Sequence, residues 1–214
     1  GMVHAYGLAA AQLARIKEAG LNLTVCIDKV AASGGYMMAC VADKILAAPF
    51  AVVGSIGVVA QVPNFHDLLE KHDIDVEVFT AGKYKRTVTV FGENTEEDKQ
   101  KFQQELEETH KLFKDFVRKY RPSLDVEQVA TGEHWYGEDA ITRNLVDALQ
   151  TSDSYILEKM TDSELYAIQS RQKPTIAQKL GISQAAQAVV ATAIDKLPDT
   201  LAKLESAKMP MVKK

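Results

Sequence analysis

Residues 23–36 read Leu-Thr-Val-Cys-Ile-Asp-Lys-Val-Ala-Ala-Ser-Gly-Gly-Tyr, and this stretch decides the fold. Its first eight residues are β-branched and apolar enough to form a largely buried parallel strand. Residues 36–42, Tyr-Met-Met-Ala-Cys-Val-Ala, predict a buried helix. Ser33 therefore lies at a turn where a strand gives way to a helix.

A hydroxyl at this turn lies near the positive end of a helix, which suits a nucleophile. The backbone N–H groups of Gly34 and Gly35 carry no side chains beside them and are placed to stabilise a developing oxyanion. The alternative is that Ser33 only caps the helix, because serine is a preferred N-cap residue and Gly-Gly is common in turns. The pentapeptide 32–36 leaves both interpretations open.

The rest of the chain alternates helices with strands. An amphipathic helix is predicted over 4–19, ending at Gly20, and strands over 23–28, 45–48 and 52–53. A helix over about 64–72 and a strand over 75–79 follow. This alternation favours an α/β fold in which helices cover a mostly parallel sheet.

Four motifs recur in the order found in a known peptidase family. They are Ala31-Ala32-Ser33-Gly34-Gly35-Tyr36, Gly54-Ser55-Ile56-Gly57-Val58, Ala81-Gly82-Lys83-Tyr84-Lys85-Arg86, and Gly132-Glu133-His134-Trp135-Tyr136-Gly137-Glu138-Asp139-Ala140 with the following Leu145-Val146-Asp147. Together they resemble the signal peptide peptidase A family, the Ser-Lys serine peptidases of family S49, and within it the SohB branch. The resemblance covers roughly residues 1–160 and implies the spiral α/β fold of Clp peptidases and crotonases.

The resemblance also implies roles for four residues. Ser33 matches the nucleophile and Lys85, 52 residues later, matches the general base. Ser55 matches a serine that hydrogen-bonds the base, and Gly34 matches a donor to the oxyanion. Lys83 stands where the family varies and is interpreted as a bystander. The expected activity is endoproteolysis of peptides, such as signal peptide remnants or membrane-protein fragments.

A lysine acts as a base only when its pKa is lowered. An exposed lysine has a pKa near 10.4 and is protonated at neutral pH, whereas burial and neighbouring cations favour the neutral amine. A histidine base is the rival, since related Clp-type peptidases use a Ser-His-Asp triad. The five histidines are better explained as solvated or structural residues: His4, His66, His72, His110 and His134.

Composition agrees with a soluble globular enzyme. With 214 residues, of which 46% are hydrophobic and 25% charged, the chain can bury a sizeable core, and a net charge of −4 argues against nucleic acid as a partner. No group of side chains has a convincing metal-ligand spacing, so neither a metal nor a cofactor is expected. Cys26 and Cys40 are predicted to be buried free thiols rather than a disulfide.

A long helix is predicted to begin near Asn94, with a capping residue and early acidic residues, and to end before Pro122. It presents an apolar stripe. Its members recur at helical spacing and are Phe102, Leu106, Phe113, Phe116, Val117 and Tyr120. The stripe packs either on the protein's own core or on a second subunit, and the resemblance implies a homo-oligomer with active sites near subunit boundaries. Later, Asn144 stands before Leu-Val-Asp where the family has glycine, which predicts a left-handed cap.

The chain is predicted to divide near residue 160. Residues 1–160 form the peptidase domain, and 161–214 form an extension with a linker, a helix over about 182–197 and a disordered tail over 208–214. The helix is expected to dock on the core or on another subunit.

The start of the chain raises an alternative function. Family members carry Ser-Pro-Gly-Gly ahead of the first helix, whereas this sequence opens with Gly1-Met2, so we expect the first strands of the domain and one oxyanion donor to be missing. The chain would then be a catalytically impaired fragment acting as an assembly or binding domain. A third class, acyl-CoA chemistry on the related crotonase fold, leaves the serine and lysine motifs unexplained. The resemblance implies the bacterial inner membrane as the location, through an anchor absent from this chain.

Overall fold

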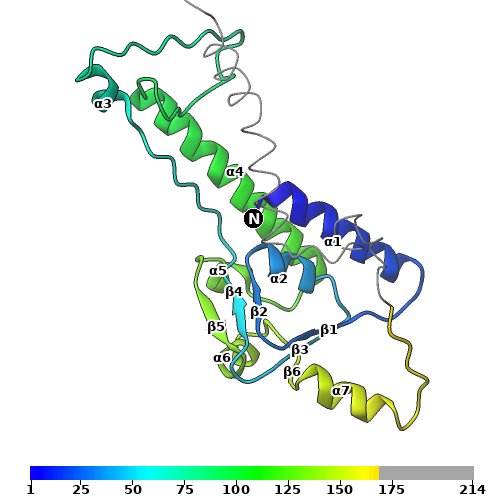
Figure 1. Ribbon diagram of the computed structural model, residues 1–214. Coiled ribbons are helices and arrows are strands. Elements are labelled where there is room, and N and C mark those ends of the chain that lie inside the picture. The colour runs from blue at the N-terminus through cyan, green and yellow to red at the C-terminus, as the bar shows by residue number, and fades with distance from the viewer. Residues whose placement is uncertain (169–214) are drawn as a thin grey trace, which may run out of the picture. The chain divides into compact units, whose positions relative to one another are not determined.

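The computed structural model describes residues 1–168, which form seven helices and six strands (Figure 1). The helices are α1 (Val3–Glu18), α2 (Gly34–Ala39), α3 (His66–Glu70), α4 (Glu96–Tyr120), α5 (Val126–Val129), α6 (Gly137–Thr142) and α7 (Ser152–Lys159). The strands are β1 (Thr24–Ile27), β2 (Val30–Ala32), β3 (Lys44–Ala47), β4 (Val52–Gly54), β5 (His134–Tyr136) and β6 (Ala148–Leu149). The predicted α/β class, with mostly parallel strands flanked by helices, is confirmed.

The strands described form two small sheets rather than the single sheet expected. One has the order β1-β3-β6 and is parallel throughout; the other has the order β2-β4-β5, with β2 and β4 parallel and β5 antiparallel to β4. The predicted run 23–30 is divided between them, because β1 ends at Ile27 and β2 begins at Val30. The strand before the Asp28-Lys29 bend therefore belongs to the first sheet, and the strand after it belongs to the second.

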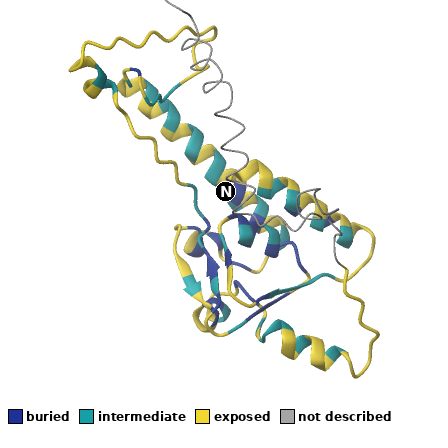
Figure 2. Cartoon of the chain, in the orientation of Figure 1, coloured by how far each residue is buried: buried dark blue, intermediate teal, exposed yellow. Residues whose placement is uncertain are grey.

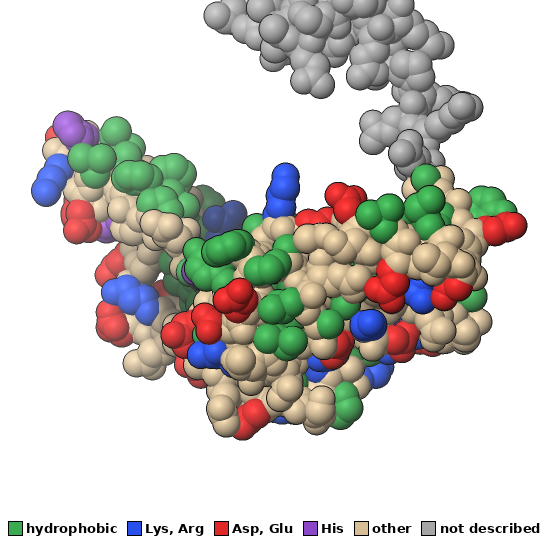
Figure 3. Space-filling model, turned by 90° about the horizontal axis from the view of Figure 1, so that it is seen from below, with side chains coloured by type: hydrophobic (Ala, Val, Ile, Leu, Met, Phe, Trp, Pro, Cys, Tyr) green, Lys and Arg blue, Asp and Glu red, His purple; other side chains and the backbone are tan. Residues whose placement is uncertain are grey.

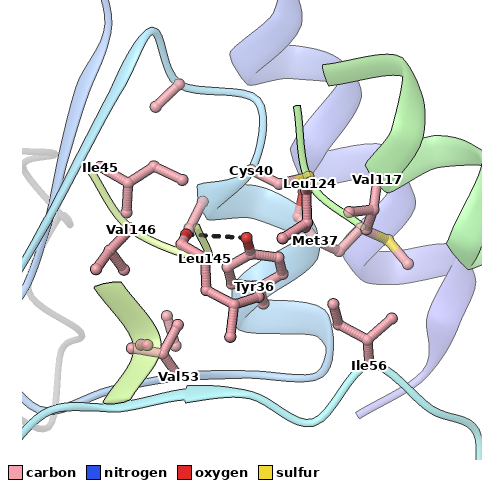
Figure 4. Close-up of a cluster of buried hydrophobic side chains, with 14 of the residues drawn as sticks. Tyr36, Met37, Cys40, Ile45, Val53, Ile56, Val117, Leu124, Leu145 and Val146 are labelled. Carbon is pink, nitrogen blue, oxygen red and sulfur yellow. Dashed lines mark hydrogen bonds between the residues drawn. The ribbon is translucent and has the colours of Figure 1, made fainter. Parts of the chain in front are cut away.

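The core lies between these sheets and the helices α1, α2 and the second half of α4. Tyr36 is fully buried at its centre, and its hydroxyl donates a hydrogen bond of 2.9 Å to the carbonyl oxygen of Leu145 (Figure 4). Around it pack the buried side chains of Met37, Cys40, Ile45, Val53, Ile56, Val117, Leu124 and Val146. Residues that lie far from α2 in the sequence therefore pack around this helix. Burial raises the pKa of the Cys40 thiol to about 12. Both cysteines are unpaired as predicted, but only Cys40 is buried, because Cys26 lies half-buried on β1.

Helix α4 begins and ends as its sequence predicts. The Thr95 side chain accepts a hydrogen bond from the Asp98 backbone N–H while the Asp98 carboxylate accepts one from the Thr95 N–H, a capping box. Of the apolar stripe, Phe113 and Val117 are buried in the protein's own core, and the ring of Phe116 contacts that of Tyr120 at 4.8 Å between centroids. This part of the stripe therefore packs on the protein's own core rather than on a second subunit.

Between β4 and α4 the chain forms an extension that we call the arm, residues 60–94. Its only buried residue is Gly92, and Figure 2 shows the arm largely exposed beside the buried strands. Its two limbs meet where the Phe65 N–H donates to the Val90 carbonyl at 2.7 Å, and the rings of Phe65 and Phe91 stack at 6.2 Å. The predicted helix is present as the shorter α3.

The strand predicted over 75–79 is wrong. Residues 74–80 belong to no strand, and all of them are exposed. Alternating apolar residues favour a strand only when a neighbouring strand accepts the backbone hydrogen bonds, and the arm has no such neighbour among residues 1–168. Apolar side chains are consequently left on the surface, and Figure 3 shows a group of them where the arm lies, at the left of the view.

The chain separates into two compact units, residues 1–164 and 165–214. The domain boundary predicted at 160 stays a prediction, and the predicted helix over 182–197 and tail over 208–214 lie outside the described residues. Among residues 1–168, no helix has the length and apolar character needed to cross a membrane.

Candidate active site

Ser33 and Ser55 lie side by side because the strands that precede them are paired. In the parallel pair of β2 and β4, Ala32 lies opposite Gly54. The next residue of each strand is a serine, and the Ser33 N–H donates a hydrogen bond of 2.8 Å to the Gly54 carbonyl. The resemblance that grouped these two serines, 22 residues apart in sequence, therefore corresponds to a spatial pair.

Both serines adopt a backbone conformation that side chains disfavour. Their φ angles are +51° for Ser33 and +52° for Ser55. Such left-handed conformations cost free energy for residues other than glycine, and they persist where surrounding contacts over-determine them. For Ser33 those contacts are the bond to Gly54 and the bond from the Met37 N–H to the Ser33 carbonyl, at 3.0 Å. The chain turns sharply here, and Ser33 stays exposed at the first turn of α2.

Gly34 is required by the packing of α1 on α2. A Cβ atom at Gly34 would overlap ring carbons of Tyr6, whereas one at Gly35 would have its nearest contact at 3.9 Å, with the Ala31 methyl. As the first residue of α2, Gly34 also has a backbone N–H with no acceptor inside the helix. Its predicted role as oxyanion donor agrees with this position but is not tested by it.

The motif 132–140 supports the Ser55 side of the site. The Ser55 N–H donates to the Glu133 carbonyl at 2.6 Å, and Gly132 donates to the Ile56 carbonyl at 3.2 Å. A Cβ at Gly57 would lie 2.9 Å from the Cα of Gly132, so the two backbones touch at a pair of glycines. The glycines of both motifs therefore allow this close approach.

A cavity of about 590 Å³ opens beside the two serines. Its lining consists of Gly1, Val3, Ser33, Ser55, Gly57, Val58, Val59, His110, Thr131 and Gly132. The Thr131 hydroxyl donates to the Glu133 carboxylate at 2.7 Å. The nucleophile candidate thus faces a space large enough for part of a peptide, walled by apolar side chains and a few hydrogen-bonding groups.

The structure does not bring Lys85 to this cavity. Lys85 is exposed on the arm, two residues after Lys83, whose Nζ pairs with the Glu97 carboxylate at 2.9 Å near the start of α4. The cavity meets α4 at His110, 13 residues further along the helix, which corresponds to roughly 20 Å at 1.5 Å per residue. Within one chain, the two members of the predicted dyad belong to different parts of the molecule.

Lys83 is a poor proton acceptor. Its hydrogen bonds with Tyr84 and then with Glu97 raise its pKa above the usual lysine value. Lys83 and Lys101 both lie over the Tyr84 ring, at 4.9 and 5.5 Å from its centroid. These contacts agree with the interpretation of Lys83 as a bystander.

His110 was assigned no role from the sequence, yet it lines the cavity. Its Nε2 atom is buried and has no hydrogen-bond partner within residues 1–168. Sequence periodicity places His110 on α4 but carries no information on which part of α4 faces the serines, so the signal was absent.

The Leu145-Val146-Asp147 motif anchors the end of α4. Arg121, only 8% exposed, donates from Nη2 to Asp147 Oδ1 at 2.7 Å and from Nη1 to Oδ2 at 3.0 Å. Asp147 also accepts from the Ile45 N–H at 2.7 Å, and Asn144 has the predicted left-handed φ of +58°. Burial alone would raise the pKa of Asp147, but the hydrogen bonds from Arg121 and Ile45 outweigh it and lower the pKa.

One group of possible metal ligands occurs among the described residues. On α3, the ligand atoms of His66, Asp67 and Glu70 lie within 4.8 Å of one another. Asp67 and Glu70 are exposed, and none of the three lines the cavity beside Ser33. Exposed acidic groups of this kind are common on protein surfaces, so the group is not assigned to the site.

The chain belongs to peptidase family S49, whose family model matches residues 15–166. The match includes the serine turn, Ser55, the arm and the Leu-Val-Asp motif. The predicted family is thereby confirmed.

Within the family the chain is similar to proteins of the SohB type. It is 65% identical over 181 residues to "Probable protease SohB" of Haemophilus influenzae, covering 85% of this chain and 51% of that protein. It is 57% identical over 169 residues to the protein of the same name from Buchnera aphidicola of Acyrthosiphon pisum, covering 79% and 50%. The chain spans about half the length of these relatives.

A solved structure described as an enoyl-CoA hydratase/isomerase family member also aligns with the chain. The alignment covers 98% of this chain and 65% of that one, at 12% identity and a TM-score of 0.38. At this level of similarity the alignment assigns no catalytic residue to this chain.

Proposed function

We propose that this chain is the catalytic region of a serine endopeptidase that cuts peptides with a Ser33–Lys85 dyad. Ser33 Oγ attacks the carbonyl carbon of the scissile bond while its proton passes to the neutral Lys85 Nζ. The C–N bond then breaks, the leaving amine takes the proton from Lys85, and water hydrolyses the acyl-enzyme. Ser55 orients the lysine, and the Gly34 N–H stabilises the oxyanion.

The pairing of Ser33 with Ser55 beside a cavity carries this proposal. Two neighbouring serines in left-handed conformations follow two paired strands, and Ser33 also stands at the start of a helix. The chain that carries them belongs to a peptidase family. A capping role alone does not account for Ser33, because its side chain makes no cap hydrogen bond to α2.

Assembly of several copies completes the dyad in this proposal. The arm that carries Lys85 exposes apolar side chains, among them Phe79 at 88% and Val59, beside its first residue, at 90%. Burial of such a surface favours association. The proposed functional form is therefore a homo-oligomer in which Lys85 approaches Ser33 on assembly. The resemblance to the SohB branch implies the bacterial inner membrane as its location.

Two other functions compete. An impaired fragment serving as an assembly or binding domain would keep the arm contacts but not the reactivity of Ser33. Acyl-CoA chemistry would use the cavity without requiring Ser33 or Lys85. Each differs from the proposal in whether Ser33 becomes covalently labelled.

Labelling with a serine-directed fluorophosphonate tests the proposal. The full-length protein is expected to be labelled at Ser33, and Ser33→Ala to abolish both labelling and peptide cleavage. Loss of a serine at a helix start costs about 1 kcal/mol at most, so the variant should fold. Ser55→Ala is the matched control: labelling should slow but remain at Ser33. Cleavage by Ser33→Ala at the wild-type rate would exclude Ser33 as the nucleophile.

A further inference from the structure

Lys85 lies on a part of the chain that is not held by burial in a core. Of residues 60–94, only Gly92 is buried, and the rest of the arm is half-buried or exposed (Figure 2). A segment with so few buried apolar contacts keeps one conformation only where hydrogen bonds and ion pairs hold it. The polar contacts around Lys85 therefore decide how its amine is presented.

The segment just before Lys85 is attached to the first turns of α4. The Lys83 Nζ pairs with the Glu97 carboxylate at 2.9 Å, and the Lys101 Nζ lies 5.5 Å from the centroid of the Tyr84 ring. Glu97 and Lys101 are four residues apart, so they share one face of the helix. Both contacts are exposed, and contacts of this kind are individually weak.

The segment just after Lys85 is attached more firmly, by Asn94. The Asn94 Oδ1 accepts a hydrogen bond of 2.7 Å from the Thr89 N–H, and the Asn94 Nδ2 donates to the Thr89 carbonyl at 2.9 Å. One amide side chain thus satisfies both backbone groups of Thr89. Asn64 donates a further bond to the same carbonyl at 3.1 Å, so Thr89 is held four residues from Lys85.

Asn94 also lies where the arm joins α4. The next residue, Thr95, is the N-cap of this 25-residue helix, and the second half of the helix is buried in the core through Phe113 and Val117. The pair formed by Asn94 and Thr89 therefore connects the Lys85 segment to a helix that has its own anchor in the core.

We infer that Asn94 is a positioning residue for the proposed base: by pairing with the Thr89 backbone at the start of α4, it fixes the segment from which Lys85 projects. Asn94 does not line the cavity beside Ser33, so it acts through Lys85 and not on the peptide. The inference rests on the proposed Ser33–Lys85 dyad and adds a residue outside the four motifs that suggested it.

Asn94→Asp tests the inference in the full-length protein, because it keeps the size of the side chain but replaces the donor Nδ2 with an acceptor oxygen. That oxygen would face the Thr89 carbonyl, so the pair should open. The kcat for a peptide should then fall about 10-fold to 100-fold, the cost of a misplaced catalytic group, while KM stays unchanged. Asn22→Asp is the matched control, since it makes the same change at an exposed position before β1, and it should keep the wild-type kcat.

Amide hydrogen exchange over residues 85–90 verifies that the pair has opened. Exchange should be faster in Asn94→Asp than in wild type and unchanged in Asn22→Asp. Unchanged exchange in Asn94→Asp, or a wild-type kcat in that variant, would overturn the inference.

The Lys85→Ala background separates positioning from general support of the fold. Because Asn94 is inferred to act only through Lys85, the double variant should react with fluorophosphonate at the same residual rate as Lys85→Ala alone. A further fall in the double variant would give Asn94 a structural role and overturn the inference.

The same variants distinguish this inference from the proposed function. If Lys85→Ala alone kept the wild-type rate, or if wild type showed neither labelling nor cleavage, the dyad and the positioning role would both be defeated. A slow Lys85→Ala together with a wild-type rate in Asn94→Asp would support the dyad and defeat the positioning role alone.

Discussion

Ser33 and Lys85, which share a proton in the proposed reaction, lie in regions built in opposite ways. The Ser33 turn joins β2 to the largely buried α2 and is held by backbone bonds to Gly54 and Met37. The arm around Lys85 has one buried residue in 35 positions. The proposed nucleophile is thus pre-positioned by the fold of one chain, whereas the proposed base would reach it only through the assembly that we propose.

The largest expected difference between the Ser33 turn and the arm concerns catalysis. Lys85→Ala should lower kcat/KM for a peptide by about 100-fold to 10 000-fold, the range of general acid–base catalysis, while the free energy of unfolding changes by less than about 0.5 kcal/mol because the side chain is exposed. Lys83→Ala is the control and should lower the rate modestly. Equal losses from both variants would leave the base unassigned.

The next effect is on the stability of the serine turn. Gly34→Ala should lower the free energy of unfolding by about 1–3 kcal/mol, because its methyl group would overlap the Tyr6 ring. Gly35→Ala, one residue further in the same helix, has room and should be neutral or stabilise by up to about 1 kcal/mol through helix propensity. Urea denaturation compares the two. A Gly34→Ala variant as stable as Gly35→Ala would show that α1 does not pack on α2 in this way.

Acid should affect the core more than the arm. Because the pKa of Asp147 is lowered in the folded protein, its carboxylate contributes stability above the ordinary pKa of about 3.9, and this contribution is lost as the pH falls through the lower folded value. Asp147→Asn should therefore be less stable at pH 7 and lose less stability on acidification than wild type. Glu93→Gln, in the arm, removes an equal charge as a control. Parallel pH profiles for wild type and Asp147→Asn would contradict the assignment.

The smallest effect on folding should come from the arm itself. Phe79→Ser should change the free energy of unfolding by less than about 0.5 kcal/mol, since Phe79 is 88% exposed, yet reduce the mass measured by light scattering. Phe50→Ser is matched, because Phe50 is 85% exposed but lies outside the arm. If Phe50→Ser dissociates the protein and Phe79→Ser does not, the arm is not the assembly surface.

Local sequence patterns predicted the features that depend on interactions between residues close in the sequence. The capped start of α4 at Thr95 and the left-handed Asn144 follow from capping chemistry and backbone preference. The single buried strand predicted before Ser33 is instead divided into β1 and β2, and most of its residues are not buried. The strand expected over 75–79 does not exist in this chain, because an alternating pattern does not supply a neighbouring strand.

The sequence motifs predicted the site only where its residues are positioned by the backbone of paired strands. Ser33, Ser55 and Gly34 are brought together by strand register, which the motif resemblance captured. The separation of Lys85 from Ser33 and the position of His110 at the cavity depend on how α4 packs on α2 and the core. No short-range pattern encodes that packing.

The register of β2 on β4 gives the two serines a separation that does not depend on the chain between them. Ala32 opposite Gly54 fixes where each strand ends, so the 22-residue interval is a consequence of α2 and β3 rather than a requirement of the chemistry. A surface loop lengthened within this interval would leave both hydroxyls in place, whereas a slip of β4 by one residue would turn Ser55 to the opposite face of its sheet. The site therefore tolerates insertion far better than misalignment, which makes the exposed end of the Ala48–Phe50 turn a natural place to graft a reporter peptide.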